Sequence, residues 1–218
     1  MKLPPDLVLF DCDGVLVDSE GVTTEVMRDN LKRYGLDIPI GQINDMFVGG
    51  TMLGVEITAR GMGADLPEDW LDEIYGEMFD RLGKEVELIP GIAWVLDVLD
   101  AAGIAYAVCS NGPHAKMNIT LGRTGLLDRF QGRIISREDV AAPKPAPDVY
   151  LLAAKQAGVK PRSCVVVEDS ASGARAGRAA KMRVFGFAAD TSPDKLAPHC
   201  HALFADMRDL PRLLRLID

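Results

Sequence analysis

Leu7-Val8-Leu9-Phe10-Asp11-Cys12-Asp13-Gly14 is the stretch that decides the fold. An unbroken apolar run of this kind is typical of a strand that is buried on both faces of a parallel sheet. Two carboxylates follow the run at once, and in open α/β sheets ligands bind just beyond the carboxyl ends of the strands. The stretch therefore predicts both a parallel sheet and a reactive edge.

Two further apolar runs along the chain end in polar residues in the same way. Residues 104–109 lead into Ser110-Asn111-Gly112, and residues 164–167 lead into Glu168-Asp169-Ser170. Helical patterns separate these runs, and strands that alternate with helices imply a parallel sheet with right-handed crossovers. We therefore expect an α/β protein whose core is a Rossmann-like, doubly wound parallel sheet.

The segment between the first two runs has a different pattern. Residues 18–84 are rich in helix formers and charged residues, and they contain no convincing buried strand. This pattern predicts two to four helices that form a separate insert. The expected division is an α/β core of residues 1–17 and 85–218 and an α-helical insert of residues 18–84.

Beyond the insert, helical and strand patterns alternate to the end of the chain. The expected helices cover about residues 92–102, 113–124, 147–157, 171–181 and 206–217, and the further strands about 132–136, 183–187 and 202–204. The strand at 202–204 is expected at an edge of the sheet, and the last helix is expected to close the fold.

Length and composition limit the classes of protein to which the chain can belong. Its 218 residues, of which 48% are hydrophobic, suit one large domain or one domain with a smaller insertion. The net charge of −8 argues against a nucleic-acid partner, whose phosphates require a basic surface. No apolar run reaches the roughly 18 residues of a membrane helix, and the first residues do not resemble a signal peptide. We therefore expect a cytoplasmic protein without a membrane partner.

The acidic residues that follow the strands need compensation for their charge. If the strands before Asp11 and Asp169 are neighbours, then Asp11, Asp13, Glu168 and Asp169 crowd one crevice. Two unit charges about 4 Å apart repel by roughly 4 kcal/mol at an effective dielectric near 20. Either some of these carboxyls are protonated or a cation lies among them. Oxygen ligands without a nearby His or Cys favour a hard ion such as Mg²⁺.

Simpler interpretations of the same residues remain open at this point. Asp11-Cys12-Asp13-Gly14 alone is also typical of a solvated acidic turn. The same string resembles the start of a calcium-binding loop, but the further ligands of such a loop are missing. Lys144 lies between Pro143 and Pro145, which predicts an extended loop just before a helix. This lysine either brings positive charge to the acidic cluster or is an ordinary exposed lysine.

Four motifs follow one another along the chain. They are Asp11-x-Asp13-Gly14-x-Leu16-x-Asp18-Ser19, Ser110-Asn111-Gly112, Lys144-Pro145 with Pro147-Asp148 beyond, and Val167-Glu168-Asp169-Ser170-x-x-Gly173. Taken together and in this order, they resemble the motifs of the haloacid dehalogenase superfamily. The insert is similar to the helical cap of the branch that contains β-phosphoglucomutase and small sugar-phosphate phosphatases. The resemblance implies a Mg²⁺-dependent phosphatase that hydrolyses a small phosphorylated metabolite, such as a sugar phosphate or sugar-acid phosphate.

The resemblance also implies a catalytic role for several motif residues. Asp11 would be the nucleophile that forms an aspartyl-phosphate, and Asp13 the acid that protonates the leaving alcohol. Ser110 and the backbone around Asn111 would hold the phosphoryl oxygens of the substrate. Lys144 would bind the substrate phosphate and offset the negative charge on it and on the nucleophile.

The metal ligands implied by the resemblance come from the first and fourth motifs. Asp11, the backbone carbonyl of Asp13, and Asp169 would bind Mg²⁺, with Glu168 acting directly or through water. Ser170 is instead expected to cap the helix that follows it. The predicted cofactor is therefore Mg²⁺, with four residues assigned to the metal site.

Members of the superfamily perform different chemistry, and individual residues help to distinguish its branches. Asp13 is present, whereas true dehalogenases lack the second acid. Thr23 and Val48 stand where mutases of this branch carry a histidine and an arginine, so a phosphosugar mutase is the weaker alternative. A phosphonatase would need an imine-forming lysine in the insert, which offers Lys32 and Lys84. A non-catalytic module that binds phosphate or Mg²⁺ is the remaining alternative.

A cap over the crevice implies a small substrate, and a monomer or weak dimer is expected. The candidate contacts of the cap with the substrate are Glu20, Gly50 and Thr51. One departure from the family pattern follows the fourth motif, where Lys181 in Ala179-Ala180-Lys181-Met182 replaces a frequent glycine. This departure concerns the local turn and leaves the chemistry unaffected.

Overall fold

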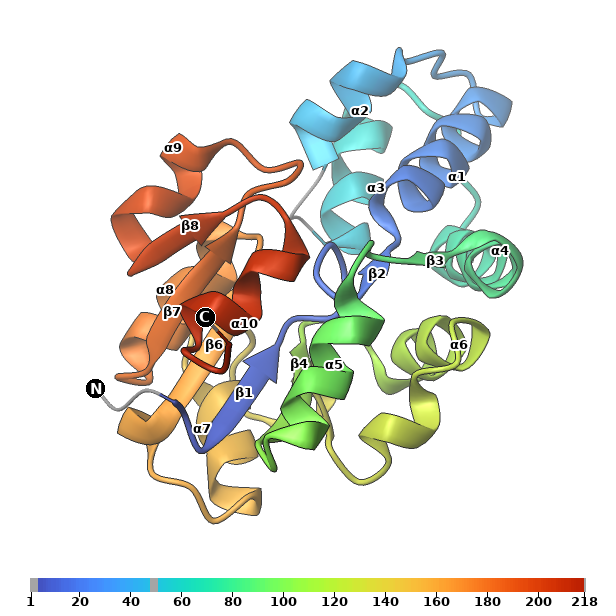
Figure 1. Ribbon diagram of the computed structural model, residues 1–218. Helices are drawn as coiled ribbons and strands as arrows, with labels where there is room; N and C mark the ends of the chain where they lie inside the picture. The colour runs from blue at the N-terminus through green and yellow to red at the C-terminus, as the bar shows by residue number, and fades with distance from the viewer. Residues whose placement is uncertain (1–3, 48–50, 218) are drawn as a thin grey trace. The chain divides into compact units, whose positions relative to one another are not determined.

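The computed structural model describes residues 4–47 and 51–217 and divides into two compact units. One unit, here called the core unit, comprises Met1–Asp18 and Leu88–Asp218. The other, here called the helical unit, comprises Ser19–Glu87. The chain thus leaves the core unit once, close to its beginning, and returns to complete it (Figure 1).

The core unit is built on a six-stranded sheet in the order β5-β4-β1-β6-β7-β8, in which all neighbouring strands are parallel. The strands are β1 (Leu7–Phe10), β4 (Ala105–Ser110), β5 (Ile134–Ser136), β6 (Cys164–Glu168), β7 (Arg183–Phe187) and β8 (Ala202–Phe204). The expected doubly wound α/β architecture is confirmed. The expected edge position of the strand at 202–204 is also confirmed, because β8 ends the sheet.

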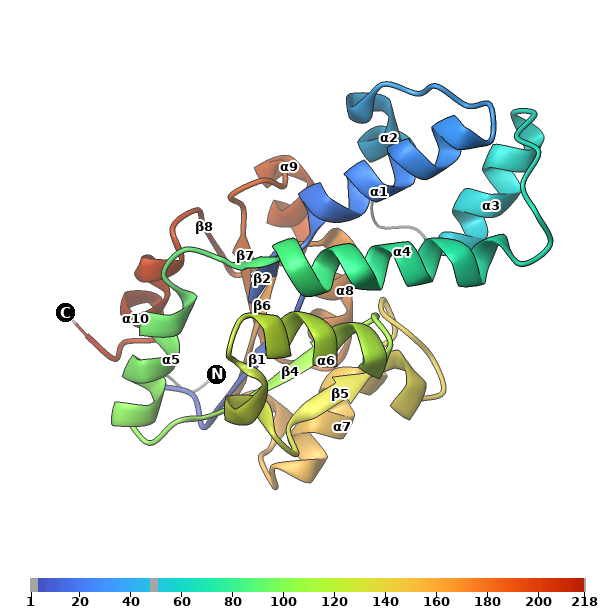
Figure 2. The same ribbon diagram turned by 90° about the vertical axis from the view of Figure 1, so that its right-hand side faces the viewer.

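Helices cover both faces of this sheet (Figure 2). On one face, α7 (Asp148–Gln156) and α8 (Ala171–Ala179) join an apolar cluster that includes Leu9 and Val166. On the other face, α5 (Ile92–Ala101) packs against β4 and α6 (His114–Arg123) against β5. Burial on both sides explains why the strand sequences are continuously apolar.

The strands that carry the polar motifs are the central ones. Strand β1 lies between β4 and β6, and Phe10 is level with Val108 on one side and Val167 on the other. The backbone N–H of Asp11 continues this ladder by donating to the Val167 carbonyl over 3.0 Å. The three motifs that follow these strands are therefore brought to one edge of the sheet.

The C-terminal segment differs from the single helix expected over residues 206–217. It forms a 3₁₀ turn, η5 (Met207–Asp209), and a short helix, α10 (Leu210–Leu213). Pro211 has no backbone N–H and fits only the first turn of a helix, so the helix must begin anew at Leu210. Arg215 then adopts a left-handed conformation, with φ +60°, which ends the helix.

Short elements complete the core unit. They are α9 (Pro193–Leu196) and the 3₁₀ turns η1 (Leu127–Phe130), η2 (Arg137–Asp139), η3 (Pro161–Ser163) and η4 (Ala197–His199). Lys181 lies in the turn after α8 with φ +61°, the left-handed conformation that a glycine adopts easily. The chain thus keeps the turn despite the substitution.

The helical unit contains α1 (Glu20–Arg33), α2 (Ile40–Phe47), α3 (Met52–Gly61) and α4 (Trp70–Glu85). Helices α1 and α4 pack together, and the buried Trp70 indole donates to the Asn30 side chain over 2.7 Å. At the boundary with the core unit, β2 (Val17–Asp18) pairs with β3 (Glu87–Leu88).

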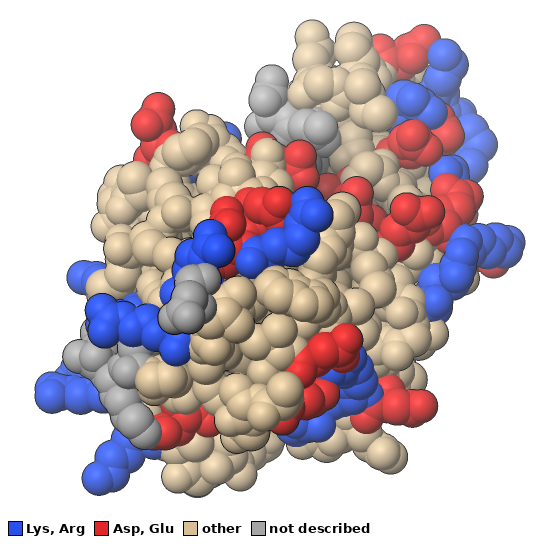
Figure 3. Space-filling model, in the orientation of Figure 1, with Lys and Arg blue, Asp and Glu red and all other residues tan. Residues whose placement is uncertain are grey.

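The surface carries charges of both signs. On the face drawn in Figure 3, acidic and basic side chains are interspersed. The whole sequence has a net charge of −8. Within residues 4–47 and 51–217, no helix is both long enough and apolar enough to cross a bilayer.

Candidate active site

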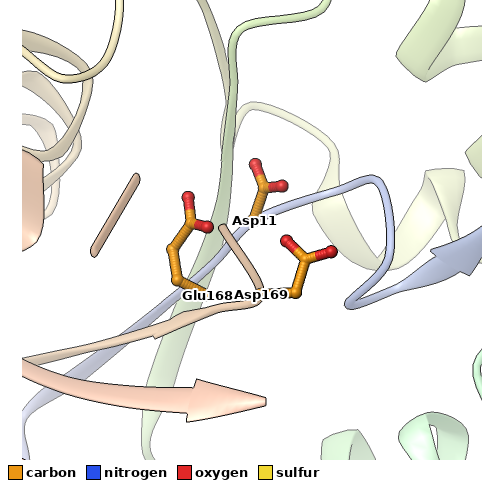
Figure 4. A group of neighbouring side chains, drawn as sticks. All are labelled: Asp11, Glu168 and Asp169. Atoms are coloured by element: carbon orange, nitrogen blue, oxygen red, sulfur yellow. The ribbon is translucent and has the colours of Figure 1, made fainter. Parts of the chain in front are cut away.

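Three carboxylates lie together at the carboxyl edge of the sheet. Asp11 follows β1, and Glu168 and Asp169 come from the end of β6. One oxygen from each side chain lies within 4.8 Å of the others, and Figure 4 shows the three groups around a common space. The parallel pairing of β1 with β6 produces this convergence, because Asp11 and Glu168 each occupy the next position after a paired residue.

Lys144 supplies positive charge inside this cluster. Its ammonium donates to Asp11 Oδ1 at 2.6 Å, to Glu168 Oε1 at 2.6 Å and to the Cys109 carbonyl at 2.8 Å. These contacts use all three N–H donors of a lysine. The residue is only 7% exposed, so the interpretation of Lys144 as an ordinary exposed lysine is wrong.

Glu168 is fully buried, and both of its oxygens already have hydrogen-bond donors. Lys144 and the Tyr150 hydroxyl donate to Oε1, and the backbone N–H and hydroxyl of Ser170 donate to Oε2. An ionised carboxylate offers about four lone-pair sites. Glu168 is therefore better suited to holding Lys144 in place than to binding a metal directly.

Burial and neighbouring charges shift the pKa values of Asp11 and Lys144. Burial raises the pKa of Asp11 to about 7, although Lys144 opposes the rise and Glu168 and Asp13 contribute to it. Burial disfavours the Lys144 ammonium, but the attraction of Asp11 and Glu168 outweighs it and raises the pKa of Lys144. The nucleophile candidate thus lacks full charge compensation from the protein alone, which is the condition that a bound cation would relieve.

The loop after β4 is held against Lys144 by side-chain hydrogen bonds. The Asn111 amide accepts from the Lys144 backbone N–H at 2.8 Å and donates to the Lys144 carbonyl at 3.2 Å. The Ser110 hydroxyl accepts from the Gly112 N–H at 2.9 Å. The Asn111 side chain is thus occupied in positioning Lys144, whereas the Ser110 proton can still be donated to an oxyanion.

Asp13 lies in different surroundings from Asp11. Its carboxylate pairs with Lys116, whose Nζ lies 2.7 Å from Asp13 Oδ1, and its side chain is 26% exposed. Lys116 comes from the first turn of α6, the helix that follows the Ser110 loop. The sequence contains a signal for this contact, because a helix that follows a motif-bearing strand begins near the site and its first turn faces the ligand edge.

Two glycines allow the close approach of backbone to these carboxylates. A Cβ at Gly173 would overlap the Glu168 carboxylate, and a Cβ at Gly14 would overlap that of Asp169. Gly14 also has φ +73°, a conformation that other residues adopt at a cost. These positions therefore keep Glu168 and Asp169 in their observed places.

The expected helix cap at Ser170 is confirmed, but the residue does more than cap. Its hydroxyl accepts from the Gly173 N–H at 3.0 Å at the start of α8 and donates to Glu168 at 2.9 Å.

Tyr150, three residues after Pro147, is a further member of the cluster that the motifs did not identify. Its contact depends on the rotation of α7 against the sheet, which a single sequence does not reveal.

The candidate contacts in the helical unit have ordinary local surroundings. Glu20 begins α1 and is exposed, and Thr51 caps α3 by accepting from the Gly54 N–H at 3.1 Å. Gly50 lies outside the described residues, as does Val48.

The helical unit also holds the two lysines considered for imine chemistry. Lys32 pairs with Asp37 and Lys84 with Asp80, and both lysine side chains are more than half exposed, at 61% and 65%. An imine-forming lysine is normally desolvated so that its amine is neutral. These surroundings argue against phosphonatase chemistry.

The sequence matches the haloacid dehalogenase-like hydrolase family over residues 5–181. The chain belongs to this family. The resemblance inferred from the four motifs is thereby confirmed, and the hydrolase family's matched region contains every motif residue of the core unit described above.

Individual members of the family are similar over nearly the whole chain. The 6-phosphogluconate phosphatase of Escherichia coli K12 is 30% identical over 210 residues, which cover 95% of this chain and 94% of that protein. A haloacid dehalogenase-like protein of Agrobacterium tumefaciens is 33% identical, with a TM-score of 0.84 and coverage of 96% of this chain and 97% of that one. A Deinococcus radiodurans family hydrolase, solved with phosphate and sodium, is 31% identical, with a TM-score of 0.83 and 99% coverage of both chains.

Proposed function

We propose that this chain is a Mg²⁺-dependent phosphatase that hydrolyses a small phosphorylated metabolite through an aspartyl-phosphate on Asp11. The observation that carries the proposal is the pairing of the two aspartates with separate lysines. Asp11 contacts Lys144 within a buried acidic cluster, whereas Asp13 contacts Lys116 outside it. This separation supports the assignment of Asp11 as the nucleophile and of Asp13 as the group that transfers a proton.

The proposed reaction has two balanced steps. In the first, an Asp11 oxygen forms a bond to phosphorus while the bond from phosphorus to the leaving oxygen breaks, and that oxygen takes a proton from Asp13. In the second, water attacks the phosphoenzyme, the bond from phosphorus to Asp11 breaks, and Asp13 takes a proton from the water. The products are the alcohol and inorganic phosphate, and both aspartates return to their initial state.

Charge compensation is the main contribution of the surrounding groups. Phosphoryl transfer depends on positioning and on neutralising the negative charge of the phosphoryl group. We assign this role to Lys144, to the Ser110 hydroxyl and to the backbone N–H groups that follow Ser110. The Asn111 side chain supports them by fixing the Lys144 backbone on both sides.

The acidic cluster fits a divalent cation because its donors are all oxygens and the protein leaves Asp11 only partly compensated. Asp11, Asp169 and the Asp13 backbone carbonyl are the proposed ligands, with Glu168 acting through water because its oxygens are already occupied. Bound Mg²⁺ would supply positive charge to the phosphoryl group. Mg²⁺ commonly uses one or two carboxylates and keeps water and phosphate as its other ligands.

The proposed substrate is a sugar phosphate or sugar-acid phosphate. It is supported by the 6-phosphogluconate phosphatase of E. coli, which is similar across 95% of this chain. The helical unit is proposed to act as a cap that limits substrate size, with Glu20, Gly50 and Thr51 as candidate contacts. Cytoplasmic location and a monomeric or weakly dimeric state are part of the same proposal.

The test is release of inorganic phosphate from a panel of phosphorylated metabolites, beginning with 6-phosphogluconate, with and without Mg²⁺. Asp11→Asn should lower turnover by about 10⁴-fold or more, as expected for loss of a nucleophile. Asp128→Asn is the matched control, because Asp128 is an exposed aspartate in η1 and should leave turnover unchanged. Undiminished turnover by Asp11→Asn would refute the proposed nucleophile.

Asp13→Asn separates the two steps. This variant should turn over poorly and accumulate phosphoenzyme, which mass spectrometry of the intact protein detects. Conversion of β-glucose 1-phosphate to glucose 6-phosphate in the presence of a bisphosphate activator would instead identify a mutase. Binding of phosphate and Mg²⁺ without turnover of any panel member would identify a non-catalytic module.

A further inference from the structure

We propose that Lys116 is a positioning residue for Asp13. Its ammonium holds the Asp13 side chain through Oδ1 beside the Ser110–Gly112 loop. In this orientation the protonated Asp13 carboxyl delivers its proton to the leaving oxygen and becomes a carboxylate. This role rests on the proposed phosphatase function and assigns to it a residue that lies outside the four motifs.

The contact between the two side chains is close and partly buried. Lys116 Nζ lies 2.7 Å from Asp13 Oδ1, and the lysine side chain is only 15% exposed. A buried lysine is unfavourable unless an anion compensates it. Burial disfavours the Lys116 ammonium, but the Asp13 carboxylate outweighs this effect and raises the pKa of Lys116. The pair therefore fixes the position of both side chains.

The beginning of α6 is itself anchored, which makes Lys116 a rigid support. The His114 backbone N–H donates to the Glu138 carboxylate at 2.9 Å, and the His114 ring contacts Asp139 at 2.8 Å. Asp139 also accepts from the Ser136 N–H at 2.8 Å, at the end of β5. The first turn of α6 is thus tied to the neighbouring strand end, two residues before Lys116.

The loop that carries Gly112 lies against the pair. A Cβ at Gly112 would be in van der Waals contact with both partners, 3.8 Å from Asp13 Oδ2 and 3.7 Å from the Lys116 side chain. Ser136 donates to the Gly112 carbonyl at 2.7 Å and so fixes this loop from the side of β5. The two lysines of the site therefore have separate partners: Lys144 orients Asp11, and Lys116 orients Asp13.

The experiment compares two aryl phosphates that differ in their need for an acid. p-Nitrophenolate leaves without protonation, whereas phenolate leaves much faster when it is protonated. The ratio kcat/KM reports the steps up to transfer of the phosphoryl group, so it isolates the acid step. Lys116→Met should lower kcat/KM for phenyl phosphate about tenfold or more beyond its effect on p-nitrophenyl phosphate.

Conservative and control variants separate positioning from general damage. Lys116→Arg keeps the positive charge and should recover much of the kcat/KM for phenyl phosphate. Lys155→Met, a substitution of an exposed lysine in α7, should change neither rate. If Lys116→Met does not fold, as judged by its urea unfolding curve, Lys116→Gln replaces it in the same comparison.

A double-mutant cycle tests whether Lys116 acts through Asp13. Adding Lys116→Met to Asp13→Asn should cost less than about twofold in kcat/KM for phenyl phosphate, because the group that it positions is already disabled. Equal losses on both esters in the single variant, or full additivity in the cycle, would overturn the proposal. Absence of Asp11-dependent hydrolysis of either ester in the unsubstituted protein would overturn the proposed function itself, and this role with it.

Discussion

The core unit and the helical unit both gather charged side chains, but they place them in different surroundings. In the core unit, Lys144, Asp11 and Glu168 are at most 9% exposed, and the lysine lies within hydrogen-bond distance of both carboxylates. In the helical unit, Arg33 contacts Glu73 and Glu77 with half of its side chain exposed, at 51%. Both are networks of ion pairs, but water solvates the charges of only the second network.

This difference supports the assignment of the proposed chemistry to the core unit. Exposed ion pairs contribute between zero and about 1 kcal/mol, because water and salt screen them. Buried groups interact much more strongly, and removing one partner leaves the others uncompensated. The rise of the Asp11 pKa to about 7 is a direct sign of this imbalance. Perturbed protonation of this kind is common at functional sites.

Removal of the buried lysine should have the largest effect. Lys144→Met leaves Asp11 and Glu168 facing each other without a cation, so the free energy of unfolding at pH 7 should fall by about 3–5 kcal/mol. Urea unfolding in the presence of EDTA measures this change. Lys155→Met is the control, and a loss under about 1 kcal/mol for Lys144→Met would contradict the contrast between the units.

The pH dependence of stability gives the second test. Because the folded-state pKa of Asp11 is raised from 3.8 to about 7, the folded protein binds more protons than the unfolded chain between these values. The stability of the metal-free protein should therefore fall as pH rises through this window, by about 2–4 kcal/mol relative to Asp11→Asn.

The measurement is urea unfolding of both proteins in EDTA from pH 4 to pH 7.5. Addition of Mg²⁺ should restore stability to the unsubstituted protein near neutral pH and have less effect on Asp11→Asn. Parallel pH curves for the two proteins would show that Asp11 titrates normally.

Substitution of Lys181, an exposed lysine of the core unit, tests whether burial or membership of the core unit decides how much a charge contributes to the free energy of unfolding. Lys181→Gly removes an exposed charge and relieves a left-handed backbone with φ +61°, so stability should rise by about 0.5–1 kcal/mol. Lys181→Ala removes the same charge but keeps the backbone strain, so it should give no gain. Thermal unfolding of both variants measures the difference.

Substitution within the exposed network should have the smallest effect. Glu77→Gln keeps an acceptor for Asn30 and removes the charge that faces Arg33, so unfolding should change by less than about 0.5 kcal/mol. The phosphatase rate should not change. A loss comparable with that of Lys144→Met would show that the helical unit depends on its charges as strongly as the core unit does.

Most of the sheet could be predicted from the sequence because its strands are buried on both faces. The runs at 7–10 and 164–168 therefore lack the alternation that makes other strands ambiguous, and the polar residues that end them mark the ligand edge. The closing helix was predicted too long because the pattern at 206–217 is helical, whereas Pro211 and the left-handed Arg215 confine the helix to four residues.

The supporting residues of the site could not be predicted with the same ease. Lys144 carries a motif, but its burial follows from three simultaneous contacts that only the folded chain brings together. Tyr150 and Lys116 reach the site from helices. The sequence places the beginning of the helix with Lys116 near the ligand edge, but the direction of either side chain depends on how its helix is rotated against the sheet. Contacts between side chains from separate elements are the part of the site that one sequence does not encode locally.

The close approach of α8 to β6 has a consequence for how freely the chain can vary. Position 173 has no space for even a methyl group, because that volume is filled by the carboxylate of Glu168, and position 14 is similarly filled by Asp169. Neither glycine has a side chain with which to touch a substrate. In a library of all single substitutions, both positions should nevertheless be as intolerant as Asp11, so mutational intolerance alone would not distinguish the reacting groups from the space that they require.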